Sequence, residues 1–229
     1  MLAIERRNEI LMKLQAERRV VVSELSQLYD VSEETIRRDL EKLVNEGVAI
    51  KSYGGAVINE NANLEVPFNI RKNYNVIGKQ KIAEQIAAMV KDGESLMLDA
   101  SSTAVYIAKE KKKKKNLTVI REGSFALVGP QTDKMLKSYH VDKAVISCKG
   151  FDLESGITDS DELHANNKIT MLGAAGKKIL AVDKSKFDKT AFTAIGALDD
   201  ITTVVTDEEP DRRWLQAFEE AGIECVYPR

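Results

Sequence analysis

The apolar residues near the start of the chain recur at the spacing of an α-helix. Ile4, Leu11 and Leu14 fall on one side of a predicted helix, and charged residues such as Arg6 are expected on the other. The β-branched run at 20–22 then predicts a short strand. Ser23 follows as a suitable N-cap for a second, shorter helix.

A third helix is predicted from a second capping signal. Ser32 precedes Glu33 and Glu34, which the positive end of a helix dipole favours in the first turn. The apolar residues beyond this cap share one face, and the hydrogen-bonding and basic residues share another. The first set is Ile36, Leu40, Leu43 and Val44; the second is Thr35, Arg38 and Lys42, with Arg37 beside it.

A hairpin closes this first region. Residues 48–52 and 56–58 are apolar enough for two strands, and Tyr53-Gly54-Gly55 between them is typical of a tight turn. Gly47 suits the left-handed position after the preceding helix. We therefore predict a small domain over residues 1–58 and a polar, unpatterned linker over 59–66.

From residue 67 to 229, short apolar runs alternate with helical patterns. Such alternation predicts a second domain of the α/β class, with a largely parallel sheet covered by helices. The expected strands are 95–98, 117–120, 144–147, 179–182, 203–206 and 224–226, and the expected helices are 77–89, 104–109, 163–173 and 211–221.

Composition narrows the function classes. With 43% hydrophobic and 31% charged residues, the chain is ordinary for a globular protein, and its net charge of −2 requires any nucleic-acid contact to come from a local basic face. We expect no membrane span, since no apolar run is long enough. Two cysteines and two histidines without ligand spacing predict no metal, no cofactor and a cytoplasmic location.

The first domain has the layout of a winged helix-turn-helix. Such a motif needs polar residues near the start of its second helix, where they can reach base edges and phosphates in the major groove. Each lone residue could equally be a solvated surface charge, but the full helix, turn, helix and Gly-Gly wing favours DNA. The candidate contacts are Ser32, Glu34, Thr35, Arg37, Arg38, Lys42 and Tyr53.

These segments resemble the DeoR family of bacterial regulators. The resemblance lies in Arg6, Ile10 and Leu14, in the run from Ser32 to Leu40, and in Tyr53-Gly54-Gly55-Ala56. It implies a winged helix-turn-helix joined to a Rossmann-like effector domain similar in fold to ribose-5-phosphate isomerase. It also implies a phosphorylated sugar or related metabolite as effector, and control of a carbohydrate operon.

A strand-to-helix turn in the second domain is a candidate phosphate cradle. Asp99, Ser101, Ser102 and Thr103 stand where a strand ends and a helix begins, so hydroxyls and free N–H groups converge there. An N-cap without any ligand fits the same residues. The resemblance adds Lys149, Gly150, Lys168 and Lys186 as effector contacts, although each lysine alone could be an ordinary surface residue.

Two departures from the family pattern stand out. His164 and Asn166 occupy positions where the family implies acidic residues, which weakens any transfer of sugar-hydroxyl contacts; His164 itself is expected to pack or lie at the surface. Between Ile120 and Arg121 the family would insert a loop, a helix, a strand and a Gly-Gly turn, and parallel strands need such a crossover. We expect either that residues disordered in a crystal are omitted here, or that a deletion has damaged the pocket.

These observations predict a DNA-binding transcriptional repressor rather than an enzyme, with no catalytic residue. Its partners would be double-stranded operator DNA, a phosphorylated sugar and further copies of itself, as a dimer or tetramer. Two alternatives remain: a sugar-phosphate isomerase in which Asp99 acts as the base, and a DNA-binding protein whose large domain serves only oligomerisation.

Overall fold

The structure is a computed structural model that describes residues 2–59, 68–110, 118–121 and 129–228. The chain forms two compact units, Met1–Ile70 and Arg71–Arg229. The predicted linker at 59–66 lies outside the described residues except for Asn59.

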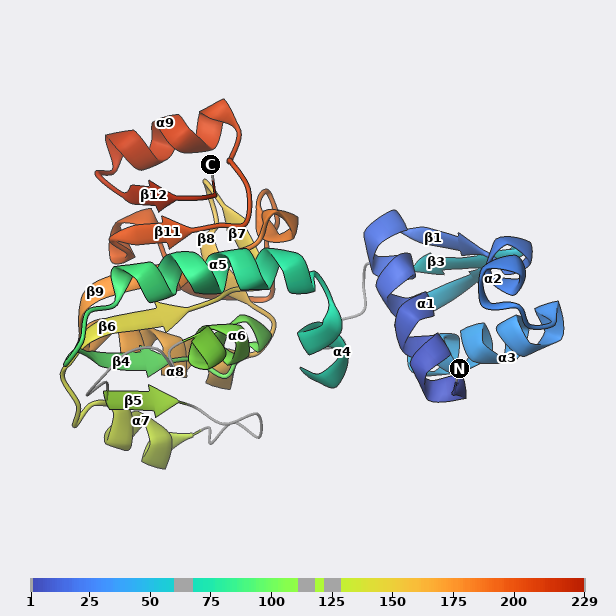
Figure 1. The fold of residues 1–229 in the computed structure, drawn as a ribbon, viewed down its shortest axis with the longest axis horizontal. Coiled ribbons are helices and arrows are strands. Elements are labelled where there is room, and N and C mark those ends of the chain that lie inside the picture. Colours follow the sequence, from blue (N-terminus) through green and yellow to red (C-terminus); the bar gives the residue numbers. More distant parts are fainter. Residues whose placement is uncertain (1, 60–67, 111–117, 122–128, 229) are drawn as a thin grey trace. The chain divides into compact units, whose positions relative to one another are not determined.

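The first unit contains helices and a small antiparallel sheet (Figure 1). Its core is apolar and comes from every element, with Ile10, Leu14, Leu25 and Ile36 fully buried. The elements in order are α1 (Ala3–Glu17), β1 (Arg19–Val21), α2 (Val22–Tyr29), α3 (Glu33–Asn45), β2 (Ala49–Ser52) and β3 (Gly55–Ile58).

Three details of this unit differ from the sequence prediction. The helix α2 begins at Val22 with Val21 as its N-cap, so Ser23 lies inside the first turn. The wing has a third strand, because β1 pairs with β3 and buries Val20. In α1, Ile4 is exposed whereas Arg6 faces inward, because a partner on α3 compensates its charge.

The second unit is built around a six-stranded parallel sheet in the order β12-β11-β9-β6-β4-β5. The helix α4 (Phe68–Asn73) spans the boundary between the two units, and the other elements of the second unit follow it in the chain. They are α5 (Val76–Met89), β4 (Ser95–Leu98), α6 (Ser102–Glu110), β5 (Thr118–Arg121), α7 (Pro130–Leu136), β6 (Val141–Ile146), β7 (Gly150–Asp152), β8 (Gly156–Asp159), α8 (Glu162–Gly173), β9 (Ala175–Ala181), η2 (Lys184–Lys186), β10 (Thr193–Gly196), η3 (Leu198–Asp200), β11 (Thr203–Val205), α9 (Arg212–Glu220) and β12 (Glu224–Val226).

Helices cover both faces of this sheet, as Figure 1 shows with α5 in front of the strands and α8 behind them. Alternate residues of each strand point to opposite faces. Leu96 and Leu98 of β4 therefore pack in the cluster that contains α5 and α6, whereas Met97 packs in the cluster that contains α8 and α9. Burial on both faces explains why the strands read as continuous apolar runs.

The α/β class and the parallel sheet confirm the predicted fold, but a second sheet was missed. It is antiparallel, in the order β10-β8-β7. Its strands have three or four residues and lie in segments with glycine and charged residues, so no alternating pattern marks them. The helices α4 and α7 were missed for the same reason, because each is at most two turns long.

The unusual junction lies within an edge strand. Ile120 and Arg121 both belong to β5, opposite Met97 and Leu98 of β4, and no cis peptide bond occurs in the described part of the chain. The loop, helix, strand and Gly-Gly turn that the family resemblance implies would stand between these two residues. Residues 122–128, which continue the chain here, lie outside the described residues.

Candidate functional site

The start of α3 presents the predicted polar residues on the surface. Ser32 caps the helix: its Oγ accepts from the Thr35 N–H at 3.3 Å and lies 3.0 Å from the Thr35 hydroxyl. Ser32, Glu34, Arg37, Arg38 and Lys42 are exposed, and Thr35 is half-buried. The opposite face of α3 packs into the core through Ile36, Leu40 and Leu43.

Two ion pairs tie the arginines of this surface to the helix itself. Arg37 pairs with Glu33 at 2.5 Å, and Arg38 pairs with Glu34 at 3.2 Å, both one turn apart. All four side chains are solvent-exposed, and exposed pairs of this spacing contribute only about 0.3–0.5 kcal/mol. Either arginine can therefore leave its glutamate for a stronger anionic acceptor at little cost.

A buried ion pair fixes α1 against α3. Arg6 Nε donates to Asp39 Oδ2 at 2.6 Å, and both side chains are less than a tenth exposed. Arg7 lies 3.9 Å from the other oxygen of Asp39. The pair joins two helices that sequence periodicity alone does not connect, and it holds α3 against α1.

The wing ends in an exposed aromatic side chain. Tyr53 is fully exposed at the turn between β2 and β3. Gly54 adopts a φ of +74°, and a Cβ on Gly55 would meet the Val20 carbonyl oxygen at 1.9 Å. Both glycines are thus required by the backbone, which leaves Tyr53 as the side chain at the tip.

In the second unit, the carboxyl ends of β4 and β6 meet where the strand order reverses. From β4 the chain crosses to the edge strand β5, and from β6 it continues through β9, β11 and β12 in the other direction. Crevices at such switch points are the usual ligand sites of open α/β sheets. Asp99 follows β4 here and is 1% exposed.

Asp99 is held by backbone donors from both sides of the switch point. Its Oδ1 accepts from the Ser101 N–H at 3.1 Å, and its Oδ2 accepts from the Ser147 N–H at 2.8 Å. These two bonds join the ends of β4 and β6 through the Asp99 side chain.

Lys168 lies between two buried carboxylates. Its ammonium pairs with Asp159 and with Asp99, the latter at 3.6 Å, and donates to the Ser147 carbonyl at 2.8 Å. Burial disfavours the charged lysine, but Asp99 and Asp159 outweigh burial and raise its pKa. Burial likewise opposes ionisation of Asp159, yet Lys168 and then Lys149 hold its pKa below the ordinary value.

The predicted phosphate cradle divides into a cap and two unused hydroxyls. Ser101 Oγ accepts from the Ala104 N–H at 3.1 Å and so caps α6. Ser102 and Thr103 are 6% and 7% exposed. Within the part of the chain that the structure describes, neither of these two hydroxyls has a hydrogen-bond partner. Buried hydroxyls are normally satisfied, so these two need a further partner.

The other predicted contacts surround the same end of the sheet in different ways. Lys149 is half-buried and close enough to Asp159 to influence its ionisation. Lys186 donates to Ser185 Oγ at 3.2 Å. Gly150 has a packing reason, because a Cβ there would lie 2.4 Å from the Lys189 carbonyl oxygen. Cys148 is buried, which raises its pKa to about 12 and keeps the thiol neutral.

Sequence reasoning missed Asp159, Lys79 and Asn75 at this end of the sheet. Asp159 ends β8, which carried no recognisable pattern. Lys79 is 4% exposed, and burial lowers its pKa to about 8 although Asp183 acts in the opposite direction. Asn75 caps α5 and donates to Asp207 at 2.9 Å. Of these three residues, only Lys79 could have been found from the sequence, because it is a lysine among the apolar positions of a predicted helix.

His164 has no place in this cluster. Its backbone N–H donates to Asp161 Oδ1 at 2.9 Å in the first turn of α8, and its side chain is half-buried.

Among the described residues, no group of histidine, cysteine and acidic side chains could hold a metal. None of the helices in the described ranges is long and apolar enough to cross a membrane.

A winged helix-turn-helix joined to an α/β unit with a polar, partly unsatisfied switch point defines a two-domain transcriptional regulator. Comparison with known proteins gives the family. Residues 6–62 match the DeoR-like helix-turn-helix domain, and residues 74–124 and 119–208 match the DeoR C terminal sensor domain in two pieces. The chain belongs to the DeoR family of transcriptional regulators.

Its relatives regulate transcription. The chain is 37% identical over 250 residues to the uncharacterized HTH-type transcriptional regulator YulB of Bacillus subtilis, covering 99% of this chain and 97% of that protein. It is 31% identical to the L-fucose operon activator of Escherichia coli K12, covering 80% and 86%. The putative aga operon transcriptional repressor of Escherichia coli O157:H7 is 26% identical over 97% and 93%.

Solved structures show only a low similarity. Ribose 5-phosphate isomerase from Plasmodium falciparum aligns with a TM-score of 0.38 at 14% identity, over 50% of this chain and 53% of that one. A similarity at this level supports no conclusion about activity.

Proposed function

We propose that this protein represses a carbohydrate catabolic operon in the bacterial cytoplasm and responds to a phosphorylated sugar or related metabolite. The observation that carries the effector half is the pair of buried hydroxyls, Ser102 and Thr103, without a partner among the described residues. They begin α6 at the switch point, where the helix dipole favours an anion. A relative named for the L-fucose operon supports the carbohydrate assignment.

On the DNA side, α3 would enter the major groove. Arg37, Arg38 and Lys42 supply the charge, and Ser32, Glu34 and Thr35 supply hydrogen-bonding groups near the helix start. Tyr53 would contact the DNA backbone from the wing. Because one winged helix covers a short stretch of DNA, we propose that a dimer or tetramer of the chain binds repeated half-sites.

On the effector side, Ser102, Thr103 and the helix N-terminus would hold the phosphate. Lys186 and Lys149 would balance part of its charge, while Lys168 remains paired with Asp99 and Asp159. Asp99 and Ser101 would shape the cradle from beneath. The paired Lys168 and Asp159 would then lie toward the hydroxyl-bearing end of the sugar.

The sign of regulation differs among the relatives, which include an operon activator and a putative operon repressor. An effector shifts DNA binding only if it binds the DNA-competent and DNA-incompetent states with different affinity. A repressor released by its effector fits a catabolic operon, which is needed only when the sugar is present.

The first experiment is to immobilise the protein, load it with sheared genomic DNA and elute with a panel of sugar phosphates. Release of one promoter fragment by one compound would support operator, effector and sign together. Ser102→Ala should retain the fragment but release it only at a higher concentration, whereas Lys177→Met, with its exposed pair to Glu224, should behave as wild type. Failure to retain any specific fragment would contradict the proposal.

A second function is favoured by one observation. The sensor-domain match comes in two pieces that meet at residues 119–124, and the alignment with the Bacillus relative is longer than this chain. A family segment missing between Ile120 and Arg121 would leave a DNA-binding protein whose large domain only oligomerises. Specific DNA retention that no sugar phosphate releases would favour this alternative.

We also propose that the protein is not an enzyme. An isomerase would need a carboxylate free to take a proton from the sugar, and both oxygens of Asp99 are occupied by backbone N–H groups. Turnover of any pentose phosphate at a useful rate would contradict this.

A further inference from the structure

The short helix α4 joins the sensor unit to the chain that leads from the DNA-binding unit. The boundary between the two compact units falls between Ile70 and Arg71, within α4. Figure 1 shows α4 beside the start of α5, at the end of the sheet to which the strands β4 and β6 point. The side chains that bind α4 therefore lie at the same end of the sheet as the candidate effector site, beside the segment that leads to the first unit.

Two buried side chains hold the carboxyl end of α4. Lys79 Nζ, from α5, donates to the carbonyl oxygens of Arg71 and Tyr74, each at 2.5 Å. Tyr106 Oη, from α6, donates to the Lys72 carbonyl at 2.8 Å. The last carbonyls of a helix lack partners within the helix, so these bonds replace water and fix α4 to α5 and α6.

Lys79 has one donor more than these bonds use. An ammonium carries three N–H groups, and within the described ranges only the Arg71 and Tyr74 carbonyls accept from Lys79. The side chain is 4% exposed. A buried, charged donor without an acceptor is costly, and an anion beside it would relieve that cost.

Three charged groups act on the ammonium of Lys79, and one of them, Lys186, is a proposed effector contact. Asp183, at the carboxyl end of β9, attracts its ammonium, and Lys186 of η2 and Arg71 of α4 repel it. Lys186 is also one of the two cations offered to the phosphate above. A dianion arriving beside Lys186 would add a second attractive charge to that of Asp183 and would offset the repulsion of Lys79 by Lys186 and Arg71.

We propose that Lys79 couples the effector site to the DNA-binding unit: an anion in the site engages its third N–H and thereby fixes α4, with Tyr106 as the second anchor. This rests on the proposed function, because it needs an anion at the start of α6. Occupancy would then restrict the segment leading to the DNA-binding unit, with no change required in the sheet. Lys79 acts here as a positioning residue, distinct from the hydroxyls that hold the phosphate.

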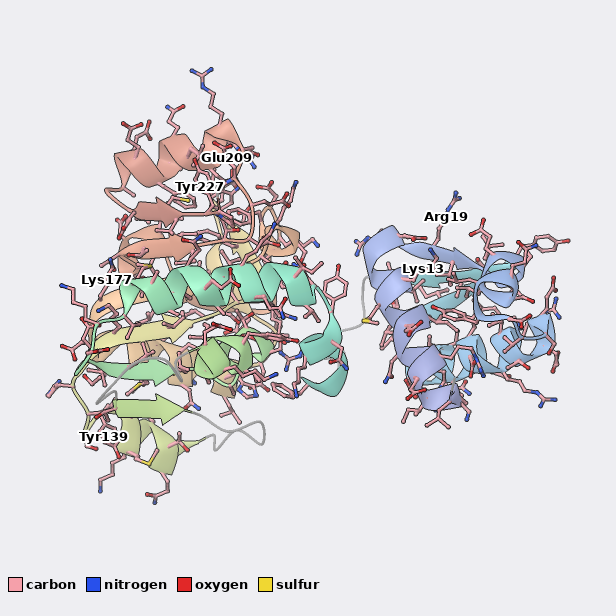
Figure 2. All side chains as sticks on the ribbon, in the orientation of Figure 1. Lys13, Arg19, Tyr139, Lys177, Glu209 and Tyr227 are labelled. Carbon is pink, nitrogen blue, oxygen red and sulfur yellow. The ribbon has the colours of Figure 1, made fainter. Side chains whose placement is uncertain are left out.

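The test is hydrogen exchange of the full chain with inorganic phosphate as the probe, against chloride at equal ionic strength. In wild type, phosphate should slow exchange about tenfold both in the peptide over residues 71–76 and at the start of α6, since a charged hydrogen bond contributes at least that much. In Lys79→Met, protection at the start of α6 should remain and protection of 71–76 should disappear. Lys177→Met, at the opposite end of the sheet (Figure 2), should match wild type.

Each contrary outcome has its own meaning. Protection of 71–76 that survives in Lys79→Met, or protection confined to α6 in wild type, overturns the coupling and leaves the effector site standing. Protection in neither region removes the proposed anion site and the coupling with it. If Lys79→Met does not fold, Tyr106→Phe replaces it: exchange at 71–76 should be faster without phosphate, while α6 is still protected. Unchanged exchange at 71–76 in that variant also overturns the coupling.

Discussion

At the scale of single residues, the sensor unit encloses one lysine between two carboxylates. Lys168 is 7% exposed, and Asp99 and Asp159 are 1% and 2% exposed. A buried pair of charges contributes little net stability compared with an apolar core, but removing one partner leaves the other uncompensated. The network should therefore affect stability most when one of its charges is removed, because the remaining charges are then buried without compensation.

Lys168→Met should lower the free energy of unfolding of the sensor unit by about 3–5 kcal/mol at neutral pH. Asp99 and Asp159 would then be buried without a cation. Urea denaturation followed by circular dichroism measures the change. Lys177→Met is the matched control and should change stability by less than about 1 kcal/mol, because its ion pair lies at the surface with the two side chains 35% and 55% exposed. Equal stability of Lys168→Met and wild type would contradict the expectation.

The same network predicts how stability depends on pH. The pKa of Asp159 lies below its ordinary 3.8 in the folded state, so its contribution is present above that value and is lost as pH falls through the lowered pKa. The pKa of Lys168 lies above 10.5, so its contribution is lost only as pH rises through the raised value. The stability difference between wild type and Lys168→Met should therefore shrink in acid. A difference that is constant from neutral pH to about pH 3 would argue against it.

At the scale of elements, α3 is positioned by one long-range pair and presents its charges through local ones. The Arg6–Asp39 pair joins residues 33 positions apart, whereas Arg37 and Arg38 pair within one turn of their own helix. The Arg6–Asp39 pair holds α3 in place. The local pairs leave Arg37 and Arg38 able to exchange a glutamate for a phosphate in the proposed complex with DNA. Stability and DNA affinity should therefore respond to different substitutions.

Arg6→Met should destabilise the DNA-binding unit by about 3 kcal/mol, because Asp39 would keep only Arg7 at 3.9 Å. Thermal unfolding monitored by circular dichroism measures this. Lys13→Met is the control on the same helix: Lys13, labelled in Figure 2, pairs with Glu17 at 2.6 Å on the surface and should contribute less than about 0.5 kcal/mol. Similar losses in the two variants would mean that the buried pair does not hold α1 to α3.

Arg38→Ala should weaken DNA binding without changing the fold. Its side chain is 74% exposed, and its exchangeable partner is Glu34. If Arg38 contacts a phosphate, the slope of log K against log salt should fall by about 1, uniformly across sequences. A loss confined to one base position would instead assign Arg38 to base contact. Lys177→Ala removes an equal charge from the other unit and should leave the slope unchanged.

At the scale of the whole molecule, the hydrophobic core of the first unit is separate from that of the second. The first unit has one core cluster, and the clusters that cover the two faces of the sheet lie wholly in the second. Each unit should therefore unfold on its own.

Calorimetry of the full chain should show two transitions. Arg6→Met should lower the midpoint of one and Lys168→Met the midpoint of the other, since each variant touches a single core. One transition shifted by both variants would show that the units unfold as a single cooperative body.

What the sequence determined was local. The period of apolar residues predicted α3 and α5 and the parallel strands, and Ser32 marked a helix start, because helix caps and amphipathic faces depend on residues within a few positions. The exposed side of α3 followed from the same period, since its core-facing side was apolar.

Only the tertiary structure decided which charges are buried together. Arg6 was assigned to the polar side of α1, yet it faces Asp39 of α3. Lys168 was predicted as an effector contact from the family resemblance, and only the structure shows that its charge on α8 is matched by Asp99 after β4 and Asp159 of β8. A buried charge is tolerated only when a partner distant in the sequence compensates it, and no local pattern records where that partner lies.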